Sequence, residues 1–159
     1  MKVSLKAMDE SSFTEYLNLV IPHYAQDNIE SGRWEDFDIL DRSKKEYDWL
    51  LPDGLDTKNN YLFNVIESES NIEVGYIGIK VEEYASTKSA FIYDIGIYEE
   101  YRRNGYAKSA LNLIEKVVSE LGVTSVALHV FNQNEGAKAL YKSIGYGVVS
   151  HNMCKVIST

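Results

Sequence analysis

The stretch that decides the fold is "AFIYDIGIYEEYRRNGYAKSAL", residues 90–111. Its first part, residues 90–98, is rich in β-branched and aromatic side chains, which is typical of a strand. From residue 106 to residue 121 the apolar side chains instead follow the period of a helix and form one stripe. The two periods meet at "RRNG", so the sequence predicts a strand, a tight loop and a helix in direct succession.

This junction is a natural anion site. The first N–H groups of a helix have no partner within the helix, and they lie at the positive end of its dipole. Gly105 permits a left-handed backbone and a close approach of a ligand, and Ala107 is too small to obstruct that approach. Arg102, Arg103 and Lys108 add positive charge to a chain whose net charge is −8. The alternative interpretation is a plain strand-to-helix turn.

Two familiar phosphate loops do not fit this junction. A Walker A loop would need glycine at the positions of Arg102 and Ala107. A dinucleotide-binding loop fails as well, because Gly96 and Gly105 lie too far apart in the sequence. An enzyme that acts on a nucleoside triphosphate is therefore disfavoured, and the pattern that remains is R-x-x-G-x-A.

Length and charge exclude several classes of protein. The 159 residues suffice for a single domain over residues 1–159 with a full core. No apolar run is long enough to span a bilayer and no secretory leader opens the chain, so we expect a cytoplasmic protein without a membrane partner. The acidic balance argues against a nucleic-acid partner. The acidic side chains form either a solvated surface or an electrostatic field that attracts cationic amines.

Candidate nucleophiles and metal ligands are few. Cys154 is the single cysteine, so no internal disulfide can form. We expect this side chain to be a small buried hydrophobe rather than a nucleophile. His23 and His151 are too isolated to indicate a metal site, so no metal is expected.

The rest of the chain predicts an α/β (α+β) domain with a mixed, mostly antiparallel central sheet flanked by helices. Strands are expected over residues 2–7, 61–67, 73–81, 90–98, 124–131 and 148–157, and helices over residues 11–28, 38–51, 106–121 and 134–146. Three consecutive strands, separated by "SESN" and "YASTKS", should form an antiparallel meander. We expect Ser11 or Ser12 to cap the first helix and Pro22 to kink or split it.

A second constellation lies in "NEGAKALYKSIGY", residues 134–146. Asn134, Ala137 and Tyr141 are spaced i, i+3 and i+7, so they project from roughly one face of the predicted helix. The preceding strand would bring Asn134 to its carboxyl end, where ligands bind in open α/β sheets.

With both stretches in view, the sequence resembles the GNAT superfamily of acetyl-CoA-dependent N-acetyltransferases. "YEEYRRNGYAKSAL" is similar to its pyrophosphate-binding motif, [QR]-x-x-G-x-[GA], and "HVFNQNEGAKALYKSIGY" is similar to its N-x-x-A-x-x-L-Y motif. The order and separation of the two motifs also fit. The resemblance is close over residues 91–146 and elsewhere holds for the order of elements only. It implies the GNAT acyl-CoA N-acyltransferase fold and acetyl transfer from acetyl-CoA to an amine acceptor.

The resemblance also implies roles for single residues. Main-chain N–H groups of the loop would hold the CoA pyrophosphate, and the cofactor-binding residues there would be Arg102, Arg103, Asn104, Gly105, Tyr106, Ala107 and Lys108. The strand end at Ile95, Gly96 and Ile97 would pair with the pantetheine arm. On the second motif, Ala137 would line the cofactor and Asn134 would hydrogen-bond it near the thioester. Tyr141 would also contact the cofactor and face the sulfur as general acid.

The general base and the acceptor are left open. His129 and Asp94 are candidate bases, while a half-buried histidine bonded to the backbone, a buried structural carboxylate or a water chain are the alternatives. Trp34 and Trp49 either shape the acceptor pocket or pack in the core. The terminal strand is also able to pair across a homodimer. A catalytically silent acyl-CoA-binding module is the alternative function.

Overall fold

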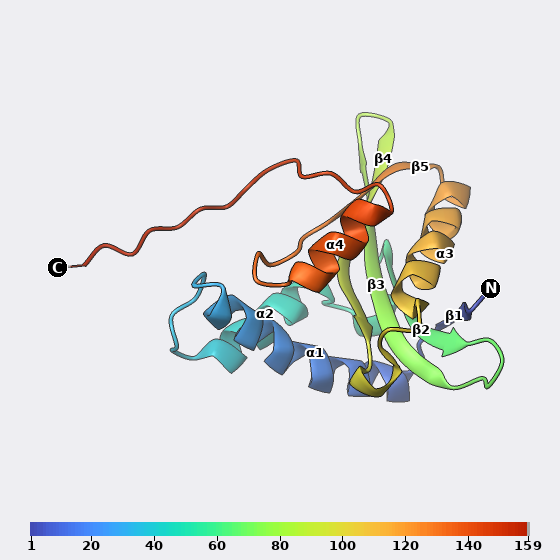
Figure 1. The fold of residues 1–159 in the computed structure, drawn as a ribbon, viewed down its shortest axis with the longest axis horizontal. Helices are drawn as coiled ribbons and strands as arrows, with labels where there is room; N and C mark the ends of the chain where they lie inside the picture. The colour runs from blue at the N-terminus through green and yellow to red at the C-terminus, as the bar shows by residue number, and fades with distance from the viewer. Residues whose placement is uncertain (159) are drawn as a thin grey trace.

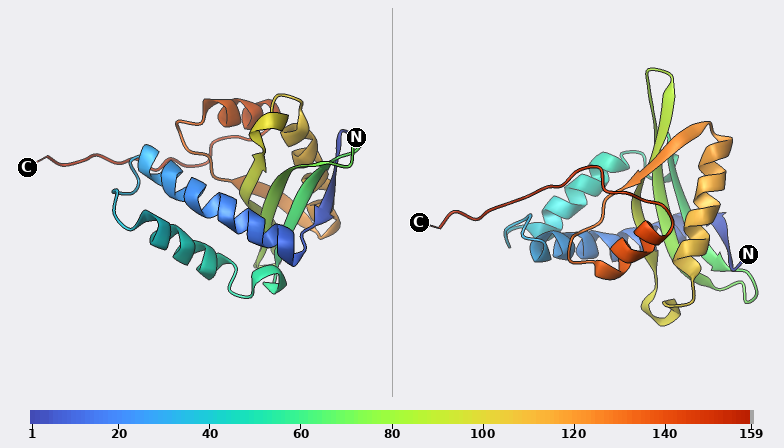
Figure 2. Two further views of the ribbon diagram at one scale, coloured as in Figure 1. Left: turned by 90° about the horizontal axis from the view of Figure 1, so that it is seen from below. Right: turned by 45° about the horizontal axis from the view of Figure 1, so that its top comes forward.

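The computed structural model describes residues 1–158 and contains one five-stranded sheet with helices on both faces (Figures 1 and 2). The strands are β1 (Val3–Ala7), β2 (Asn60–Glu67), β3 (Glu73–Tyr84), β4 (Thr87–Ile97) and β5 (Val123–Leu128). The α-helices are α1 (Glu10–Glu30), α2 (Ile39–Leu50), α3 (Tyr106–Glu120) and α4 (Glu135–Ser143). Two short 3₁₀ helices, η1 (Gly54–Asp56) and η2 (Glu99–Tyr101), lie in connections.

The strand order is β1-β2-β3-β4-β5. The first three neighbouring pairs are antiparallel, whereas β4 and β5 are parallel. A parallel pair needs a crossover, and α3 provides it. The predicted fold class, a mixed and mostly antiparallel sheet flanked by helices, is confirmed, as is the meander formed by β2, β3 and β4.

Each face of the sheet carries its own core. On one face, α3 packs through Leu111, Ile114 and Val118 against apolar residues of the strands, and α4 adds Leu140 and Tyr141 at the margin. The core on the other face joins α1, α2 and β2, and its buried residues are Met8, Phe13, Tyr16, Val20, Tyr47, Leu51 and Leu62. In Figure 2 (left) α1 and α2 lie below the sheet, while α3 and α4 lie above it.

Strands β4 and β5 part before β4 ends. Their pairing stops at Ile92 and Leu128, although β4 continues to Ile97. A bulge lies at this point, because Ile79 pairs with Ile92 and Gly78 with Asp94, which leaves Tyr93 as the extra residue. Bulges re-aim side chains and end strand pairing. From Tyr93 onward, β4 therefore has a neighbour on one side only.

The first helix differs from its prediction at its start and at its proline. Asp9, rather than Ser11 or Ser12, is the N-cap: its carboxylate accepts from the Ser12 N–H at 2.8 Å, and the Ser12 hydroxyl accepts from the Asp9 N–H at 3.0 Å. Pro22 does not split the helix, which runs unbroken from Glu10 to Glu30. Next to the proline, α1 packs against α2, where buried Ser43 donates to the Ile21 carbonyl oxygen at 2.7 Å.

The predicted loop "YASTKS" is mostly strand. Strands β3 and β4 continue to Tyr84 and from Thr87, so only Ala85 and Ser86 form the turn. Both have positive φ, 51° and 70°, as a two-residue hairpin turn requires. Neither residue is a glycine, so the sequence carries no typical hairpin-turn pattern at this point.

The predicted strand over residues 148–157 is wrong. Residues 147–158, here called the tail, have no regular secondary structure, and every one of them is exposed. Figure 1 shows the tail running away from the sheet. Within residues 1–158 no strand lies beside it, and without a partner its backbone cannot form a ladder. Cys154 lies in the tail and is exposed, so its predicted burial is wrong as well.

Candidate active site

The loop between β4 and α3 is held in place from three sides. The Lys2 ammonium donates to the Asn104 carbonyl oxygen at 2.8 Å, and the Asn104 amide donates to the Tyr101 carbonyl oxygen at 2.9 Å. The guanidinium of Arg102 donates through Nε to the Ile97 carbonyl oxygen at 2.9 Å. These bonds fix the loop on the end of β4 without using its own main-chain donors.

The loop backbone turns through two left-handed residues, Arg103 with φ 67° and Gly105 with φ 78°. Gly105 is the N-cap of α3 and brings no side chain to the cap. The side chain of Tyr106 is engaged elsewhere, because its hydroxyl donates to Glu67 of β2 at 2.9 Å. Among the predicted loop residues, Tyr106 therefore has only its backbone available to a ligand.

A run of main-chain N–H groups in this loop has no protein partner. The flanking donors are satisfied: Arg102 donates to the Glu99 carbonyl at 3.3 Å and Ser109 to the Gly105 carbonyl at 3.1 Å. Between them, none of the N–H groups of residues 103–108 donates a hydrogen bond to a described residue. Unpaired donors at a helix N-terminus bind anions. Exposed Lys108, together with Arg102 and Arg103, adds positive charge around them.

The end of β4 supplies a second set of free backbone groups. Ile95, Gly96 and Ile97 pair with β3 on one side, and on the other side no strand within residues 1–158 lies beside them. Gly96 is required here, since a Cβ at this position would lie 2.3 Å from the Tyr76 hydroxyl oxygen. An extended ligand can add to such an edge as a further strand. In all three views the end of β4 lies between α3 and α4 (Figures 1 and 2).

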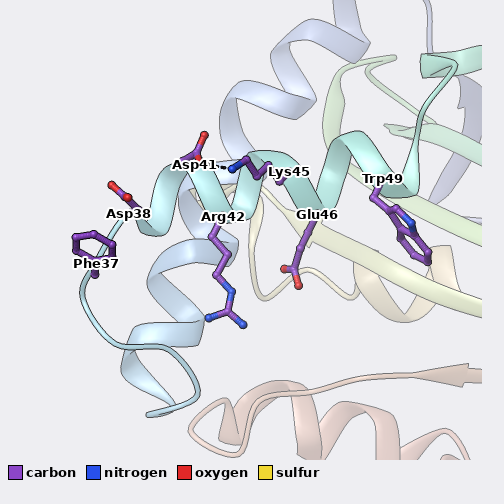
Figure 3. Close-up of a pocket in the computed structure, with 7 residues that line it drawn as sticks. All are labelled: Phe37, Asp38, Asp41, Arg42, Lys45, Glu46 and Trp49. Atoms are coloured by element: carbon purple, nitrogen blue, oxygen red, sulfur yellow. Dashed lines mark ion pairs between the residues drawn. The ribbon is translucent and has the colours of Figure 1, made fainter.

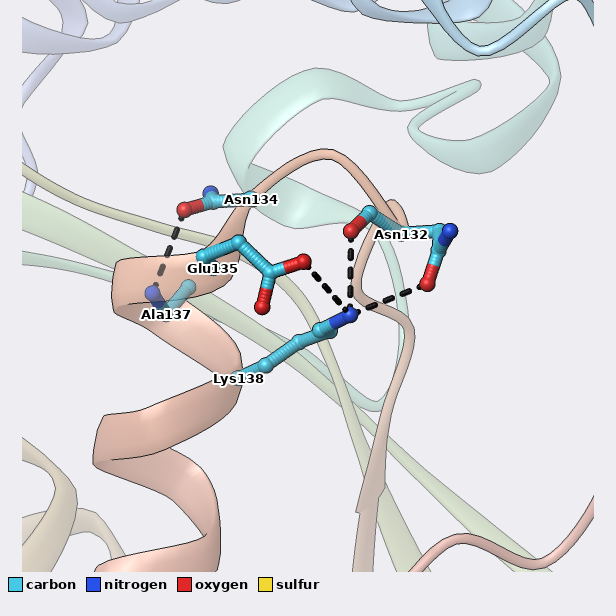
Figure 4. Close-up of polar contacts among 5 residues, drawn as sticks. All are labelled: Asn132, Asn134, Glu135, Ala137 and Lys138. Carbon is cyan, nitrogen blue, oxygen red and sulfur yellow. Dashed lines mark hydrogen bonds and ion pairs between the residues drawn. The ribbon is translucent and has the colours of Figure 1, made fainter.

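The start of α4 is rigidly fixed (Figure 4). Asn134 is its N-cap, and the side-chain oxygen accepts from the Ala137 N–H at 3.1 Å. Lys138 donates to the carbonyl and side-chain oxygens of Asn132, at 3.0 and 2.9 Å, and to Glu135 at 3.1 Å. Capping occupies the oxygen of Asn134 only, so its amide nitrogen is available to an acceptor.

Tyr141 lies two turns further along α4 and is half-buried against the α3 face of the core. Its ring packs edge-on against Tyr146 with centroids 5.8 Å apart. Burial raises the pKa of Tyr141. Its hydroxyl makes no hydrogen bond to a described residue, so the phenol is protonated at neutral pH and is available as a donor.

Asp94 lies on the opposite face of β4, under α1 and α2. Its Oδ2 accepts hydrogen bonds from the hydroxyl groups of Tyr16 and Tyr47, the latter at 2.8 Å. Both tyrosines are almost completely buried, with 3% and 6% of their surface exposed. Burial raises the pKa of Asp94 to about 6, although the two hydrogen bonds lower it in part. Asp94 is not part of a salt bridge within residues 1–158.

Aromatic rings surround this carboxylate. Tyr16 lies edge-on to Tyr76 and Tyr24 edge-on to Tyr47, with centroids 5.6 and 5.8 Å apart. Trp34 is 4% exposed and packs edge-on against Tyr24 at 5.4 Å, so it belongs to the aromatic cluster rather than to an open pocket.

A separate groove of about 630 Å³ lies along α2 (Figure 3). It is lined by Phe37, Asp38, Asp41, Arg42, Lys45, Glu46 and Trp49. Trp49 is 80% exposed and extends from the end of α2. Neither Asp94 nor its two tyrosines line this groove, so its residues are not placed at the carboxylate.

His129 lies beyond the end of β5, which stops at Leu128 instead of residue 131. Because β4 bends away at its bulge, β5 has no partner past that point. The ring of His129 is at the surface, edge-on to Phe131 at 4.8 Å. Partial burial and the nearby Arg33 guanidinium lower its pKa. Within residues 1–158 no hydrogen bond orients the His129 ring, in contrast to the carboxylate of Asp94.

Sequence patterns alone did not reveal three residues of the site. Tyr16 and Tyr47 occupy buried, core-facing positions of α1 and α2, and their spacing in the sequence indicates packing only. Lys2 contacts a loop 102 positions away in the chain. The one hint in the sequence is that these helices carry tyrosine hydroxyl groups on their core-facing side, while a predicted strand carries the carboxylate of Asp94.

Comparison with known proteins agrees with this geometry. The model of the Acetyltransferase (GNAT) family matches residues 24–146. YycN of Bacillus subtilis, described as an uncharacterized N-acetyltransferase, is 37% identical over 148 residues, which cover 92% of this chain and 93% of YycN. YdgE of the same organism has the same description and is 32% identical over 155 residues, 98% of each chain.

The crystal structure of YycN superposes on the fold with a TM-score of 0.92 and 34% identity, and the alignment covers 99% of each chain. Fold, motifs and relatives therefore agree with the resemblance seen in the sequence, and the protein belongs to the GNAT family of acetyltransferases.

Proposed function

We propose that this acetyltransferase moves an acetyl group from acetyl-CoA to a primary amine by direct attack of the amine on the thioester. The observation that carries the proposal is the run of unpaired main-chain donors at residues 103–108, next to the free edge of β4. Together they match a donor substrate with a diphosphate at one end and an amide-bearing chain at the other.

The diphosphate fits the loop in both geometry and charge. Main-chain N–H groups at the start of α3 supply hydrogen bonds and the positive end of the helix dipole. Arg102, Arg103 and Lys108 supply local positive charge on a chain whose net charge is −8. The pantetheine amides would pair with the backbone of Ile95, Gly96 and Ile97, as an added strand does. This placement would direct the thioester along the part of β4 that no longer pairs with β5.

The acceptor amine must lose a proton before it can attack. For a lysine-like amine this costs about 4.6 kcal/mol at pH 7, so a base is useful. We assign the base to Asp94, because Tyr16 and Tyr47 orient its carboxylate and its pKa of about 6 leaves it ionised at neutral pH. His129 is the second candidate, and no hydrogen bond positions it.

The transfer then balances without further reactants. The amine nitrogen bonds to the carbonyl carbon, the carbon–sulfur bond breaks, and the sulfur leaves with the electron pair as a thiolate. The nitrogen then loses a second proton to solvent and becomes the neutral amide. Tyr141 would stabilise the departing thiolate by a hydrogen bond, since full proton transfer from a phenol to a thiolate is uphill by about 2 kcal/mol. The free amide nitrogen of Asn134 would donate to the cofactor beside the thioester, and Ala137 would leave room for it.

The direct test is an amine panel. The protein is incubated with acetyl-CoA and primary amines of differing charge, and both CoA release and the acetylated product are measured by mass spectrometry. We expect transfer to at least one amine. Binding of acetyl-CoA without transfer to any amine would support the silent acyl-CoA-binding module instead. Binding of ATP but not of CoA would overturn both assignments.

Gly105→Ala should weaken acetyl-CoA binding about tenfold in calorimetry. A left-handed residue with a Cβ is strained by roughly 1–2 kcal/mol, and relief of that strain would rotate the unpaired N–H groups. Gly122→Ala is the matched control, because Gly122 has φ 85° at the far end of α3, against φ 78° for Gly105. Equal affinities of the two variants would contradict the role of the loop.

Tyr141→Phe should lower kcat about 10- to 100-fold and leave the affinity for acetyl-CoA unchanged, because the hydroxyl would act only as sulfur departs. Tyr146→Phe is the control, since its ring touches that of Tyr141. Steady-state kinetics and calorimetry separate the two effects. Turnover of Tyr141→Phe equal to the wild type would remove the proposed role.

The pH profile of kcat/KM should fall below about pH 6, as Asp94 takes up a proton and ceases to act as a base. Tyr47→Phe removes one hydrogen bond to the ionised carboxylate, which raises the pKa of Asp94 and moves the acid limb to higher pH. Tyr24→Phe is the control, because Tyr24 packs on Tyr47 without bonding to Asp94. Loss of the acid limb in His129→Asn, with Asp94→Asn still active, would assign the base to His129.

A further inference from the structure

One side chain of β3 crosses over the free end of β4. Tyr76 of β3 pairs with Gly96 of β4 in the register of the two strands. The ring of Tyr76 lies over this glycine, because a Cβ at Gly96 would collide with the phenol oxygen and would lie 2.9 Å from Cε1. A glycine within a strand often marks such a close approach. The hydroxyl of Tyr76 is therefore placed over β4, beyond the bulge at Tyr93.

This hydroxyl lies on the same face of the sheet as the carboxylate of Asp94. Side chains two positions apart on a strand point to the same face, so the space over Gly96 adjoins Asp94. Tyr76 packs against the core cluster under α1 and α2, and its ring lies edge-on to Tyr16 with centroids 5.6 Å apart. The hydroxyl of Tyr16 in turn donates to Asp94. Tyr76 and Asp94 thus belong to one group of side chains on the acceptor face of β4.

Both polar groups have hydrogen-bonding capacity that no described residue uses. Asp94 accepts both of its tyrosine hydroxyls through Oδ2, and its Oδ1 has no partner within residues 1–158. The Tyr76 hydroxyl also makes no hydrogen bond to a described residue, and unlike the Tyr93 hydroxyl it is not a fully buried atom. Asp94, Gly96 and Tyr76 are each half-buried. Part of this group therefore remains accessible at the free end of β4.

The charges around Tyr76 favour a cation. Burial and the neighbouring Asp94 carboxylate raise the pKa of Tyr76, the Arg102 guanidinium lowers it in part, and Asp27 raises it further. The phenol is protonated at neutral pH, and its oxygen is able to accept a hydrogen bond. Two carboxylates and one guanidinium thus act on this hydroxyl, so the local balance is negative.

We propose that the hydroxyl of Tyr76 is part of the acceptor site and holds the ammonium group of the substrate together with Asp94. An ammonium group has three N–H donors. One N–H would donate to the phenol oxygen of Tyr76, and a second would donate to Oδ1 of Asp94 and pass its proton to that oxygen. The bond to Tyr76 then keeps the neutral amine at the free end of β4. The inference rests on the function proposed above and adds a residue that binds the acceptor.

The decisive experiment separates the hydroxyl from the ring and from simple charge. The n-butylammonium and n-butyltrimethylammonium cations carry the same charge and chain, but only the first has N–H donors. In NMR titrations of the full chain at pH 7, Tyr76→Phe should weaken the binding of n-butylammonium about tenfold, since a hydrogen bond to a charged group is lost. The binding of n-butyltrimethylammonium should be unchanged.

Tyr98→Phe is the matched control. The ring of Tyr98 packs against that of Tyr76 with centroids 6.1 Å apart, but its hydroxyl donates to Glu73 at 2.8 Å. This variant should bind both cations as tightly as the wild type does. Equal affinity of the wild type and Tyr76→Phe for n-butylammonium would overturn the proposal, as would an equal loss with both cations or no binding of n-butylammonium to the wild type.

Steady-state kinetics with n-butylamine add a second measurement. Tyr76→Phe should raise KM for the amine about tenfold and leave KM for acetyl-CoA unchanged. A lower kcat with an unchanged KM for the amine would place the hydroxyl at the acyl group and would overturn the role in acceptor binding. If the protein acetylates no amine, the proposed function fails, and the titration alone still decides whether Tyr76 holds an ammonium group.

Discussion

The site depends on one constraint: a backbone N–H group needs an acceptor, and this chain leaves a run of them without one. Two local features create the vacancy. The bulge at Tyr93 lies where β4 stops pairing with β5, and the left-handed residues Arg103 and Gly105 turn the loop whose N–H groups have no acceptor within residues 1–158. A sheet that stayed paired to Ile97 would have filled its own edge and would offer no place for an extended ligand.

The two faces of β4 carry different functional groups. On the face covered by α3 and α4, backbone groups and the Tyr141 hydroxyl suit an acyl donor. On the face covered by α1 and α2, a carboxylate held by two buried tyrosines suits the acceptor amine. Up to Ile92, β4 is hydrogen-bonded to a strand on each edge. Only the part of β4 beyond the bulge has a free edge, so only there can a ligand lie beside the strand. The bulge therefore determines which part of β4 is open on one edge.

Elements that depend on a local pattern of residues could be predicted from the sequence. Helix α3 was expected over residues 106–121 and runs from Tyr106 to Glu120, and the meander has the expected order. The left-handed Gly105 at the start of α3 was expected as well. Contacts between distant segments could not be predicted in this way. The bonds of Tyr16 and Tyr47 to Asp94 join three elements, and Lys2 reaches Asn104 across the sheet. The apolar pattern of the tail predicted a strand, but within residues 1–158 no neighbouring strand lies beside it.

The pKa shifts of Asp94 and Asp9 have opposite directions. Asp9, at the start of α1, has a lowered pKa because it accepts backbone and side-chain hydrogen bonds from Ser12, so its charge is favourable to folding. Burial raises the pKa of Asp94 from 3.8 to about 6 despite two hydrogen bonds. The folded chain then holds this proton more tightly than the unfolded chain, and the contribution of Asp94 to stability is lost as the pH rises from about 4 to about 6. At neutral pH its ionised form lowers the free energy of unfolding by on the order of 3 kcal/mol. An apolar residue would fill the same site without that penalty, which is in line with the role proposed above for Asp94.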